Sequence, residues 1–441
     1  MPSRSAFSWL LEKEWHELVS SRAWWVLLVL MGPLVGQSFI SAATTYAELS
    51  GYGGSTDGVG EAFSPLVGIW APTFSACELA AAFLLPFVAI RLVAGDRQSG
   101  ALKLEVQHAM PAAQRVAAKA LVLLAGWLIA SIPAVAAVAL WRSYGGFVYV
   151  PELSAVVAGH LLNAGLTVGL AFAAAAITEH PATAAIVTLS VTIGTWILNF
   201  VAAVQGGVWE RAAGYTPTAM VSEFQHGLVR ADVTVAAILL TVAGLAVAAI
   251  WTRLGASTRR KTTESGAVAL LAATALMVST YLTPAWDVSE ARLNSFRPVD
   301  EQLLRSIPQP LRVEVHLAPE DPRRVDFERR VLSKLRRVMT NLRIDYVSKT
   351  STGLFEQSDE HYGEIWYEVY TFRTMTRATT VESALEEIFE VCGLLAPTEA
   401  EDDVFRGHPL PVPPQGASVV FYGFWPAVVG AAAVLIQRRK R

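Results

Sequence analysis

Gly95 and Gly100 have the spacing of a phosphate-binding loop, and this is the first pattern in the chain that suggests chemistry. In such a loop the second glycine is followed by Lys and by Ser or Thr, which hold the phosphates and a magnesium ion. Ala101 and Leu102 stand at those positions, and an apolar segment precedes the glycines where a strand is required. The sequence therefore predicts that this chain hydrolyses no nucleotide.

Other catalytic signatures are also absent from the sequence. Neither the His-Glu-x-x-His pattern of zinc peptidases nor the Gly-x-Ser-x-Gly turn of serine hydrolases occurs, and the 8 His are scattered. The 2 Cys, Cys77 and Cys392, fall in segments of different character, so we expect two unpaired thiols. We predict that the chain is not an enzyme and holds no metal ion or cofactor of its own.

Four polar residues that interrupt apolar segments are the candidates for a translocation path or gate: Glu78, His160, Asn163 and Asn199. A carboxylate inside a membrane is costly and normally faces a cavity or a partner. Glu78 is therefore expected either to line a gate or touch a polar group of a substrate, or to reach the interface or pair locally. His160 and Asn163 lie one helical turn apart, where hydrogen bonding between helices is the expected role.

The composition is that of a membrane protein. Hydrophobic residues make up 53% of the 441 residues and charged residues 17%, against about 25% charged residues in a soluble domain. The apolar residues are concentrated in segments close to the length of about 20 residues that crosses a bilayer. The predicted spans are residues 23–44, 72–94, 116–140, 154–177, 182–204, 231–251, 266–284 and 418–436.

Lysine and arginine are distributed unevenly over the segments between these spans. They are frequent in residues 1–22, after the second span, after the sixth span and in the C-terminal tail. The opposite short loops hold only Arg142, Arg211 and Arg230. Because the side richer in Lys and Arg is normally the cytoplasmic one, we expect both termini to be cytoplasmic in a multi-pass protein of the plasma (inner) membrane.

Residues 5–21 have the periodicity of an amphipathic helix. Its expected apolar face holds Phe7, Leu10, Leu11, Trp15 and Leu18. Its expected polar face holds Glu12, Lys13, Glu14 and Glu17. A helix of this kind next to a span suits the membrane surface, so we favour an interfacial helix over a soluble cap helix.

Two segments resemble those of ABC-2-type transporter permeases. The first resembles the family's polar hairpin between two spans, and its matching residues are Arg91, Gly95, Asp96, Arg97, Ser99, Gly100, Ala101, Leu102, Pro111 and Lys119. The second, residues 205–230, resembles the family's outer re-entrant helical hairpin, and its matching residues are Pro217, Phe224, Gly227, Val229 and Asp232. The resemblance implies a six-span permease core over residues 23–255, with a docking hairpin at residues 95–115.

The resemblance also implies a partner that hydrolyses ATP. In this family two copies of a separate ABC ATPase bind ATP and Mg and dock beneath two paired permeases, so a homodimer of this chain is expected. The implied ATPase-docking residues are Glu14, Arg91, Asp96, Arg97, Gly100, Leu102 and Lys103. The alternative is that the hairpin is an ordinary solvated loop.

Residues 285–415 are charged and contain no span, and their patterns predict an α/β domain. Residues 311–317 alternate like a strand, Arg323–Leu342 has a helical pattern and residues 342–347 read as the next strand, which together predict a βαβ unit. The other predicted elements are a strand at 364–372 and a helix at Val381–Val391.

The start of this domain resembles the extracytoplasmic domain of gliding-motility-type ABC subunits. The resemblance rests on Trp286–Val288, Ser295-Phe296 and Ile307–Val313, while Ser289 and Asn294 depart from the pattern. It implies binding of an extracytoplasmic protein or polymer. The basic helix that follows predicts either contact with anionic lipid or polymer, or a solvated face balanced by nearby acids; we favour the second and expect no nucleic acid.

The predicted fold class is an α-helical polytopic membrane protein with an ABC-2 or type V exporter-like six-span core, two further spans and an inserted extracytoplasmic α/β domain. The predicted domains are residues 1–22 (interfacial helix), 23–255 (core), 256–284 (seventh span), 285–415 (α/β domain) and 416–441 (eighth span and basic tail). Within the gliding-motility and nitrous-oxide-reductase-maturation-like branch, the resemblance implies a permease subunit that couples ATP hydrolysis by a separate chain to export. The alternative is a complex that transports nothing and relays ATPase strokes to an extracytoplasmic partner.

Overall fold

The computed structural model describes residues 6–51, 63–100, 110–205, 208–319, 321–347, 361–397 and 405–438. The chain divides into two compact units. The first comprises Met1–Asn199, Val208–Val288 and Arg406–Arg441, and the second comprises Phe200–Gly207 and Ser289–Phe405. The strand at 285–287, which the sequence suggested as the start of the α/β domain, thus groups with the helices of the first unit.

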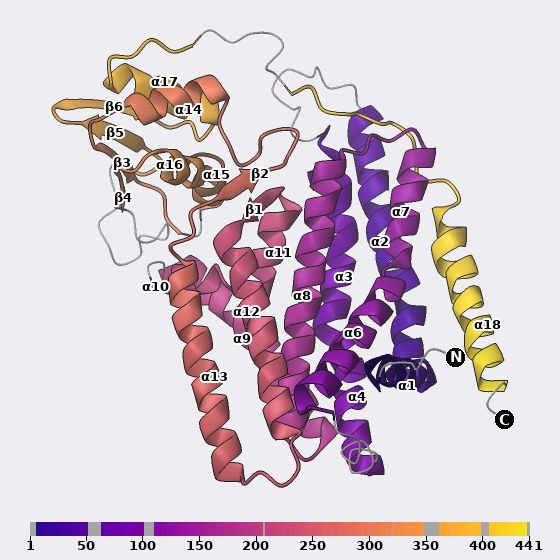
Figure 1. Ribbon diagram of the computed structural model, residues 1–441. Coiled ribbons are helices and arrows are strands. Elements are labelled where there is room, and N and C mark those ends of the chain that lie inside the picture. The colour runs from indigo at the N-terminus through magenta and orange to yellow at the C-terminus, as the bar shows by residue number, and fades with distance from the viewer. Residues whose placement is uncertain are drawn as a thin grey trace, which may run out of the picture. The chain divides into compact units, whose positions relative to one another are not determined.

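In the part of the chain that the structure describes, eight helices are long and apolar enough to cross a membrane. They are α2 (Arg22–Gly51); the π-helix Leu66–Trp70 continued by α3 (Ala71–Phe83) and α4 (Leu85–Ser99); α6 (Ala112–Ala130) with α7 (Ile132–Ser143); α8 (Val150–Ile177); α9 (Pro181–Gln205); α12 (Ala231–Trp251); α13 (Thr258–Ser279); and the π-helix Val419–Phe424 continued by α18 (Trp425–Arg438). The chain is therefore a helical polytopic protein, in which the helices run side by side in a bundle (Figure 1).

The seventh span begins earlier than the sequence suggested. It was expected at residues 266–284, but α13 runs from Thr258 to Ser279. The Ser257 side chain accepts a hydrogen bond from the Arg260 amide, so the helix has its N-cap ahead of a polar first turn that hydropathy alone does not include. Helix α13 thus begins about two turns before the apolar segment that predicts the span, and these turns are polar.

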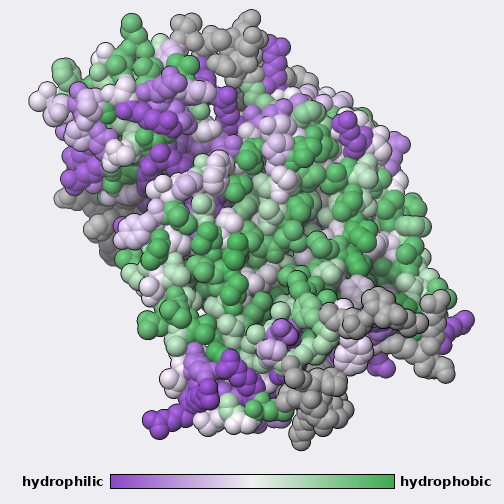
Figure 2. All heavy atoms as spheres, in the orientation of Figure 1, coloured by the Kyte–Doolittle hydropathy of each residue, from purple (hydrophilic) through white to green (hydrophobic). Residues whose placement is uncertain are grey.

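The bundle carries a broad band of hydrophobic side chains on its surface (Figure 2). The second span and α8 bury 67% and 61% of their apolar windows inside the chain, whereas α9, α13 and α18 bury only 11%, 6% and 11%. On α13, Leu270, Leu271 and Met277 are each at least 70% exposed. Such faces are stable only against lipid or another apolar surface, which supports a membrane-embedded chain.

Two prolines lie where a span is divided into two helices. Helix α3 ends at Phe83 and α4 begins at Leu85, with Pro86 in its first turn. Helix α6 ends at Ala130 and α7 begins at Ile132, with Pro133 in its first turn. Proline has no amide hydrogen and is accommodated where a helix begins, so these spans consist of two joined helices rather than one.

The segment predicted as a re-entrant hairpin, residues 205–230, forms two short helices and a strand. These are α10 (Val208–Ala213), α11 (Pro217–Gln225) and β1 (Leu228–Arg230). Strand β1 pairs antiparallel with β2 (Ala285–Asp287), which follows α13. This short sheet joins the ends of the sixth and seventh spans and holds α11 beside them (Figure 1).

The second unit is an α/β domain built on a four-stranded sheet of order β4-β3-β5-β6. Its elements are α14 (Pro298–Ser306), β3 (Leu311–Val315), α15 (Pro322–Phe327), the π-helix Glu328–Leu332, α16 (Ser333–Val338), β4 (Leu342–Tyr346), β5 (Ile365–Val369), β6 (Phe372–Thr376) and α17 (Val381–Val391). Strands β3 and β4 are parallel with the helical segment between them, so the predicted βαβ unit is confirmed. The predicted helix at Val381–Val391 is confirmed as well.

The single strand predicted at 364–372 is wrong. Strand β5 ends at Val369, and Tyr370 takes a left-handed backbone with φ of 55°. The chain then reverses into β6, which pairs antiparallel with β5. No glycine, proline or asparagine occurs in Val369–Phe372, so the usual residues of a tight turn are missing from the sequence.

The basic helical segment of this domain is balanced by its own acids, as favoured from the sequence. Arg323 pairs with Asp321 at 2.8 Å and Arg329 with Asp326 at 3.0 Å, and Arg336 pairs with Glu328. Asp321 is also the N-cap of α15, where it accepts a hydrogen bond from the Arg323 amide at 2.9 Å. These three arginines are therefore paired with nearby acids rather than presented as a row of unpaired cations.

We expect Asp321→Ala to speed hydrogen exchange in α15 at pH 7 by about fivefold, since the loss of an N-cap costs about 1 kcal/mol. The hydrogen bond from the Arg323 side chain lowers the pKa of Asp321 from 3.8 to about 2. A group whose folded-state pKa is depressed stabilises above its unfolded value, and that part of its contribution is lost as pH falls from 3.8 through about 2. The difference between variant and wild type should therefore shrink below pH 3.8. Asp326→Ala, at a half-exposed site, is the matched control and should change the rate little.

Candidate functional site

Helix α1 (Ala6–Ser20) buries a carboxylate on the face that packs against the bundle. Leu10, Glu14 and Leu18 follow one another at four-residue steps, and each is 0% exposed. The expectation that Glu14 belongs to the polar face is therefore wrong, because four-residue steps return to the same side of an α-helix. Leu18 lies on Gly126 of α6, where an added Cβ would come 2.7 Å from its Cδ2 atom. The absent side chain at Gly126 lets α1 approach α6 closely.

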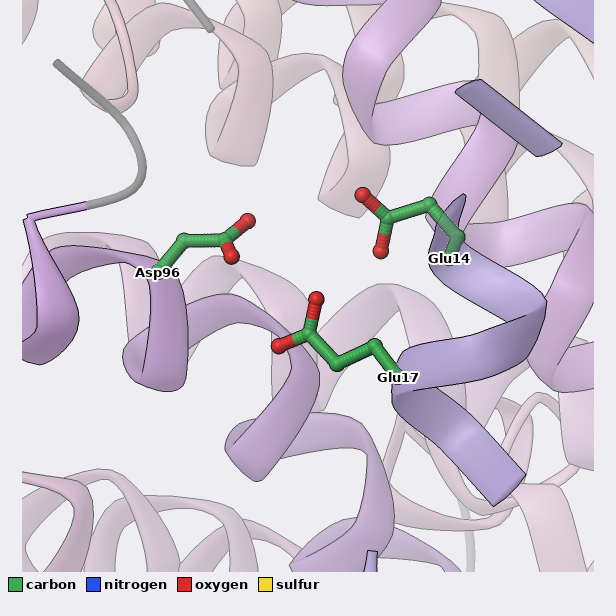
Figure 3. Close-up of side chains that lie close together, drawn as sticks. All are labelled: Glu14, Glu17 and Asp96. Carbon is green, nitrogen blue, oxygen red and sulfur yellow. The ribbon is translucent and has the colours of Figure 1, made fainter. Parts of the chain in front are cut away.

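Glu14 belongs to a cluster of charges that joins α1, α4 and α6. The carboxylates of Glu14, Glu17 and Asp96 point toward one another in this cluster (Figure 3). The Lys119 Nζ atom lies 2.6 Å from Glu14 Oε2 and 2.5 Å from Asp96 Oδ2. The Lys13 Nζ atom lies 3.0 Å from Glu14, 3.2 Å from Glu17 and 3.2 Å from Asp96. Lys119 thus connects the N-terminal helix to the last turn of α4 from within the third span.

The charges of this cluster are buried, which makes their pairing important for the stability of the fold. The side chains of Glu14, Asp96 and Lys119 are 0%, 3% and 7% exposed. Desolvation raises the pKa of the Glu14 carboxyl above its ordinary value of 4.5, against the opposing attraction of Lys119. Removing one partner from a buried ion pair leaves the other charge without compensation, which is strongly destabilising. The three helices are therefore held together by charges that depend on one another.

The same carboxylates have the donor set of a hard cation site, because one oxygen from each of Glu14, Glu17 and Asp96 lies within 4.8 Å of the others. Two ammonium groups already form ion pairs with them, however. Lys13 contacts all three residues and Lys119 contacts Glu14 and Asp96. These side chains fit an ion-pair network better than they fit a metal centre.

The residues expected to dock an ATPase have different surroundings in the structure. Glu14 and Asp96 are buried and paired internally, so the expectation that they present charges to a partner is wrong. Arg97 caps the C-terminal end of α8 by donating to the carbonyl oxygens of Ala176 at 2.7 Å and Thr178 at 3.1 Å. Arg91 is exposed on α4. Leu102 and Lys103 lie outside the described residues.

Gly100 ends α4 with φ of 76°, the left-handed conformation that glycine adopts at helix ends without strain. Gly95 lies inside α4 beside α1, where an added Cβ would make an ordinary contact of 3.5 Å with the Glu17 Oε1 atom. The two glycines that resemble a phosphate-binding loop thus lie within and at the end of a helix, not in a loop after a strand.

Two of the four candidate gate residues lie together. A pocket of about 390 Å³ in the first unit is lined by Ser75, Glu78, Leu79, Trp196, Asn199 and Thr218. Helix α3 provides Glu78, α9 provides Asn199 and α11 provides Thr218, whose side chain is the hydrogen-bonding neighbour of the Glu78 carboxyl. The Thr216 hydroxyl donates to Asn199 Oδ1 at 2.9 Å, which fixes the amide against the start of α11. The pocket therefore depends on three elements distant in sequence.

His160 and Asn163 are buried on α8, away from this pocket lining. The His160 Nε2 atom lies 3.3 Å from Gln225 Nε2 of α11, and its ring lies 5.5 Å from that of Phe74. This arrangement agrees with hydrogen bonding between helices, the role favoured for His160 from the sequence. The four candidates thus form two separate groups.

Several residues that build these sites were not among the predicted site residues. Lys119 was noted only as a match to the family pattern, although a lysine inside an apolar span is itself a signal of a buried partner. Arg230 pairs with Glu223 at 2.7 Å and with Asp232 at 2.6 Å, which ties α11 and β1 to α12. Trp196 and Thr218 complete the pocket around Glu78. No local pattern identifies these two, because tertiary packing alone brings them together.

The chain was compared with protein-family models, curated proteins and solved structures. None of the three comparisons found a significant match for it.

Proposed function

We propose that this chain is the membrane-spanning permease subunit of an ABC-2-type transporter, which couples ATP hydrolysis by a separate ATPase subunit to export of a substrate. The motif resemblance at residues 84–119 and 205–230 supports the family. The eight apolar helices support a membrane-embedded chain. In this proposal both termini are cytoplasmic and the chain lies in the plasma membrane, because Lys and Arg concentrate at that end of the spans.

The observation that carries the proposal is the charge cluster around Lys119. It joins α1 to the two helices, α4 and α6, that flank the segment proposed to dock the ATPase. A displacement of that segment would move α4 and α6 together with α1, since separating them exposes buried charges. A stroke of the ATPase is thereby passed to two spans at once, which is what an ATP-coupled permease requires.

Two copies of the chain and two ATPase subunits form the proposed complex. Helix α9 buries only 11% of its apolar window within one chain, which favours burial of this face against a second copy or lipid. ATP and Mg belong to the ATPase in this proposal. The α/β domain is proposed to contact an extracytoplasmic protein or polymer.

A second candidate is a complex that relays ATPase strokes to that extracytoplasmic partner and transports nothing. The observation that favours it is the folded domain at 289–405, which has its own hydrophobic core and is larger than a capping loop needs to be. The two candidates differ in whether a small molecule crosses the membrane.

The test is co-purification with ATPases encoded beside the chain's gene, followed by measurement of ATP turnover. Asp96 and Arg97 are unsuitable for charge reversal because they hold the fold together, so the reversal is Lys103→Glu. We expect this variant to lose the ATPase while keeping its elution volume. Arg142→Glu is the matched control, since Arg142 is exposed at the far end of α7, and it should retain the ATPase.

A chain that purifies alone, or that loses the ATPase equally with either reversal, would contradict the proposal. Loss of turnover without loss of the complex would place the effect in coupling rather than in docking. Export by proteoliposomes that contain the complex separates the transporter from the mechanical alternative.

A further inference from the structure

The pocket around Glu78 combines a carboxylate, an aromatic face and an apolar approach. Glu78 is half-buried on α3, and within the described part of the chain no Lys, Arg or His pairs with it. Its only hydrogen-bonding neighbour there is the Thr218 side chain, which carries no charge. A carboxylate inside a membrane is neutralised by a proton or by a cation that a ligand brings.

The pocket lining also contains an aromatic side chain from another helix. Trp196 of α9 lines the pocket and is 40% exposed. Its ring is held edge-on to Phe83 with a centroid separation of 5.5 Å. The face of tryptophan is the strongest aromatic site for ammonium and other organic cations, and its attraction increases where water is excluded.

The surroundings are apolar. Leu79 lines the pocket and is 45% exposed, and Ile193, one turn before Trp196, is 46% exposed. A volume of about 390 Å³ is within the range that encloses a small organic molecule. Ser75, Asn199 and Thr218 provide hydrogen-bonding groups around the carboxylate without adding a charge.

We propose that this pocket binds amphiphilic organic cations, with the cationic centre between the Glu78 carboxylate and the Trp196 ring and the apolar body along Leu79 and Ile193. A neutral or anionic molecule of the same shape leaves the carboxylate uncompensated and binds more weakly. The inference deepens the proposed function, because it names the substrate class of the transporter. Binding itself does not require the ATPase.

The experiment uses two probes of the same shape and opposite charge, tetraphenylphosphonium and tetraphenylborate. Their binding to the full chain in nanodiscs of zwitterionic lipid is measured by equilibrium dialysis, with empty nanodiscs subtracted. We expect saturable binding of the phosphonium that weakens about tenfold in Glu78→Gln, since a contact with a charged partner contributes roughly that factor. Binding of the borate should not weaken in this variant.

Two further variants keep the test specific. Glu48→Gln removes a carboxylate that is exposed on α2 and outside the pocket lining, and it should leave phosphonium binding unchanged. Trp196→Leu keeps an apolar wall but removes the aromatic face, and it should weaken the phosphonium several-fold more than the borate. Elution volume and light scattering confirm that each variant is folded and in the same oligomeric state.

The proposal is overturned if the wild-type chain shows no saturable phosphonium binding, if Glu78→Gln and Glu48→Gln behave alike, or if the borate binds as tightly as the phosphonium. It is also overturned if Glu78→Gln changes only the proportion of dimer, because the pocket is then filled by a second copy. If the chain binds the phosphonium but recruits no ATPase, the proposed binding pocket is supported and the proposed transporter function is contradicted. If the chain recruits an ATPase but does not bind the phosphonium, the transporter function is supported and the cation pocket is contradicted.

Discussion

We expect Lys119→Met to lower the free energy of unfolding by about 3–5 kcal/mol, because it leaves two buried carboxylates without their closest cation. Glu14 and Asp96 each lie within 2.6 Å of the Lys119 ammonium. Methionine is similar in length to lysine, so the change removes the charge and leaves little empty space. The measurement is SDS titration of the purified chain in mixed micelles, followed by tryptophan fluorescence.

The deficit should depend on pH. Burial already raises the pKa of Glu14 above 4.5, and removal of Lys119 takes away the largest opposing attraction. A carboxyl whose folded-state pKa is raised favours folding at low pH, and this contribution is lost as pH rises from its unfolded value through the folded one. The variant should therefore be weakest relative to wild type near neutral pH and should recover partly as pH falls toward 4.5.

Lys13→Met is the matched control in the same cluster. The Lys13 side chain is 26% exposed and reaches the same carboxylates, so its loss should cost about 1 kcal/mol or less. Adding Glu14→Gln to Lys119→Met should restore part of the stability, because it removes one of the two uncompensated charges. Equal losses for the two lysines, or no recovery in the double variant, would show that Lys119 has no special place in the cluster.

The helices and strands can be predicted from the sequence where a local pattern of residues allows only one stable backbone conformation. A bilayer-length apolar run has one stable backbone solution, so hydropathy predicts the spans. Alternation at 311–317 with a basic helix behind it predicts the parallel pair of β3 and β4. The chain reversal at Tyr370 is not predicted by such a pattern. A residue other than glycine or asparagine adopts the left-handed backbone conformation only when its tertiary surroundings impose it.

The site is less accessible to sequence reasoning, and Glu14 shows why. Three charged neighbours, Glu12, Lys13 and Glu17, suggest a polar face, but helical periodicity groups Glu14 with Leu10 and Leu18. Its partner Lys119 is 105 residues away, and no spacing rule connects them. The pocket has the same character, since its polar side chains come from three helices, α3, α9 and α11, that are distant in sequence.

The second large effect is expected at the contact between α8 and α12, where Gly244→Leu should lower the free energy of unfolding by about 3 kcal/mol. A Cβ at Gly244 would lie 2.5 Å from the carbonyl oxygen of Gly169, and a Cβ at Gly169 would lie 2.8 Å from that of Thr241. Because these obstacles are backbone atoms, no side-chain rotation relieves them and the two helices must separate. The same SDS titration measures the loss.

The control substitutions also replace a glycine in a membrane helix, but at positions where the added side chain meets no backbone atom of a neighbouring helix. Gly266→Leu on α13 adds the same side chain where nothing lies within 4 Å, so it should be neutral or slightly stabilising through helix propensity. Gly165→Ala lies one turn before Gly169, but its Cβ would meet only the Thr241 side chain, at an ordinary 3.4 Å from Oγ1 and 3.6 Å from Cγ2. The paired glycines at 165 and 169 are a common spacing in membrane helices, yet only the second touches backbone. If Gly244→Leu proves as mild as Gly266→Leu, the close approach of α8 and α12 is not what stabilises the bundle.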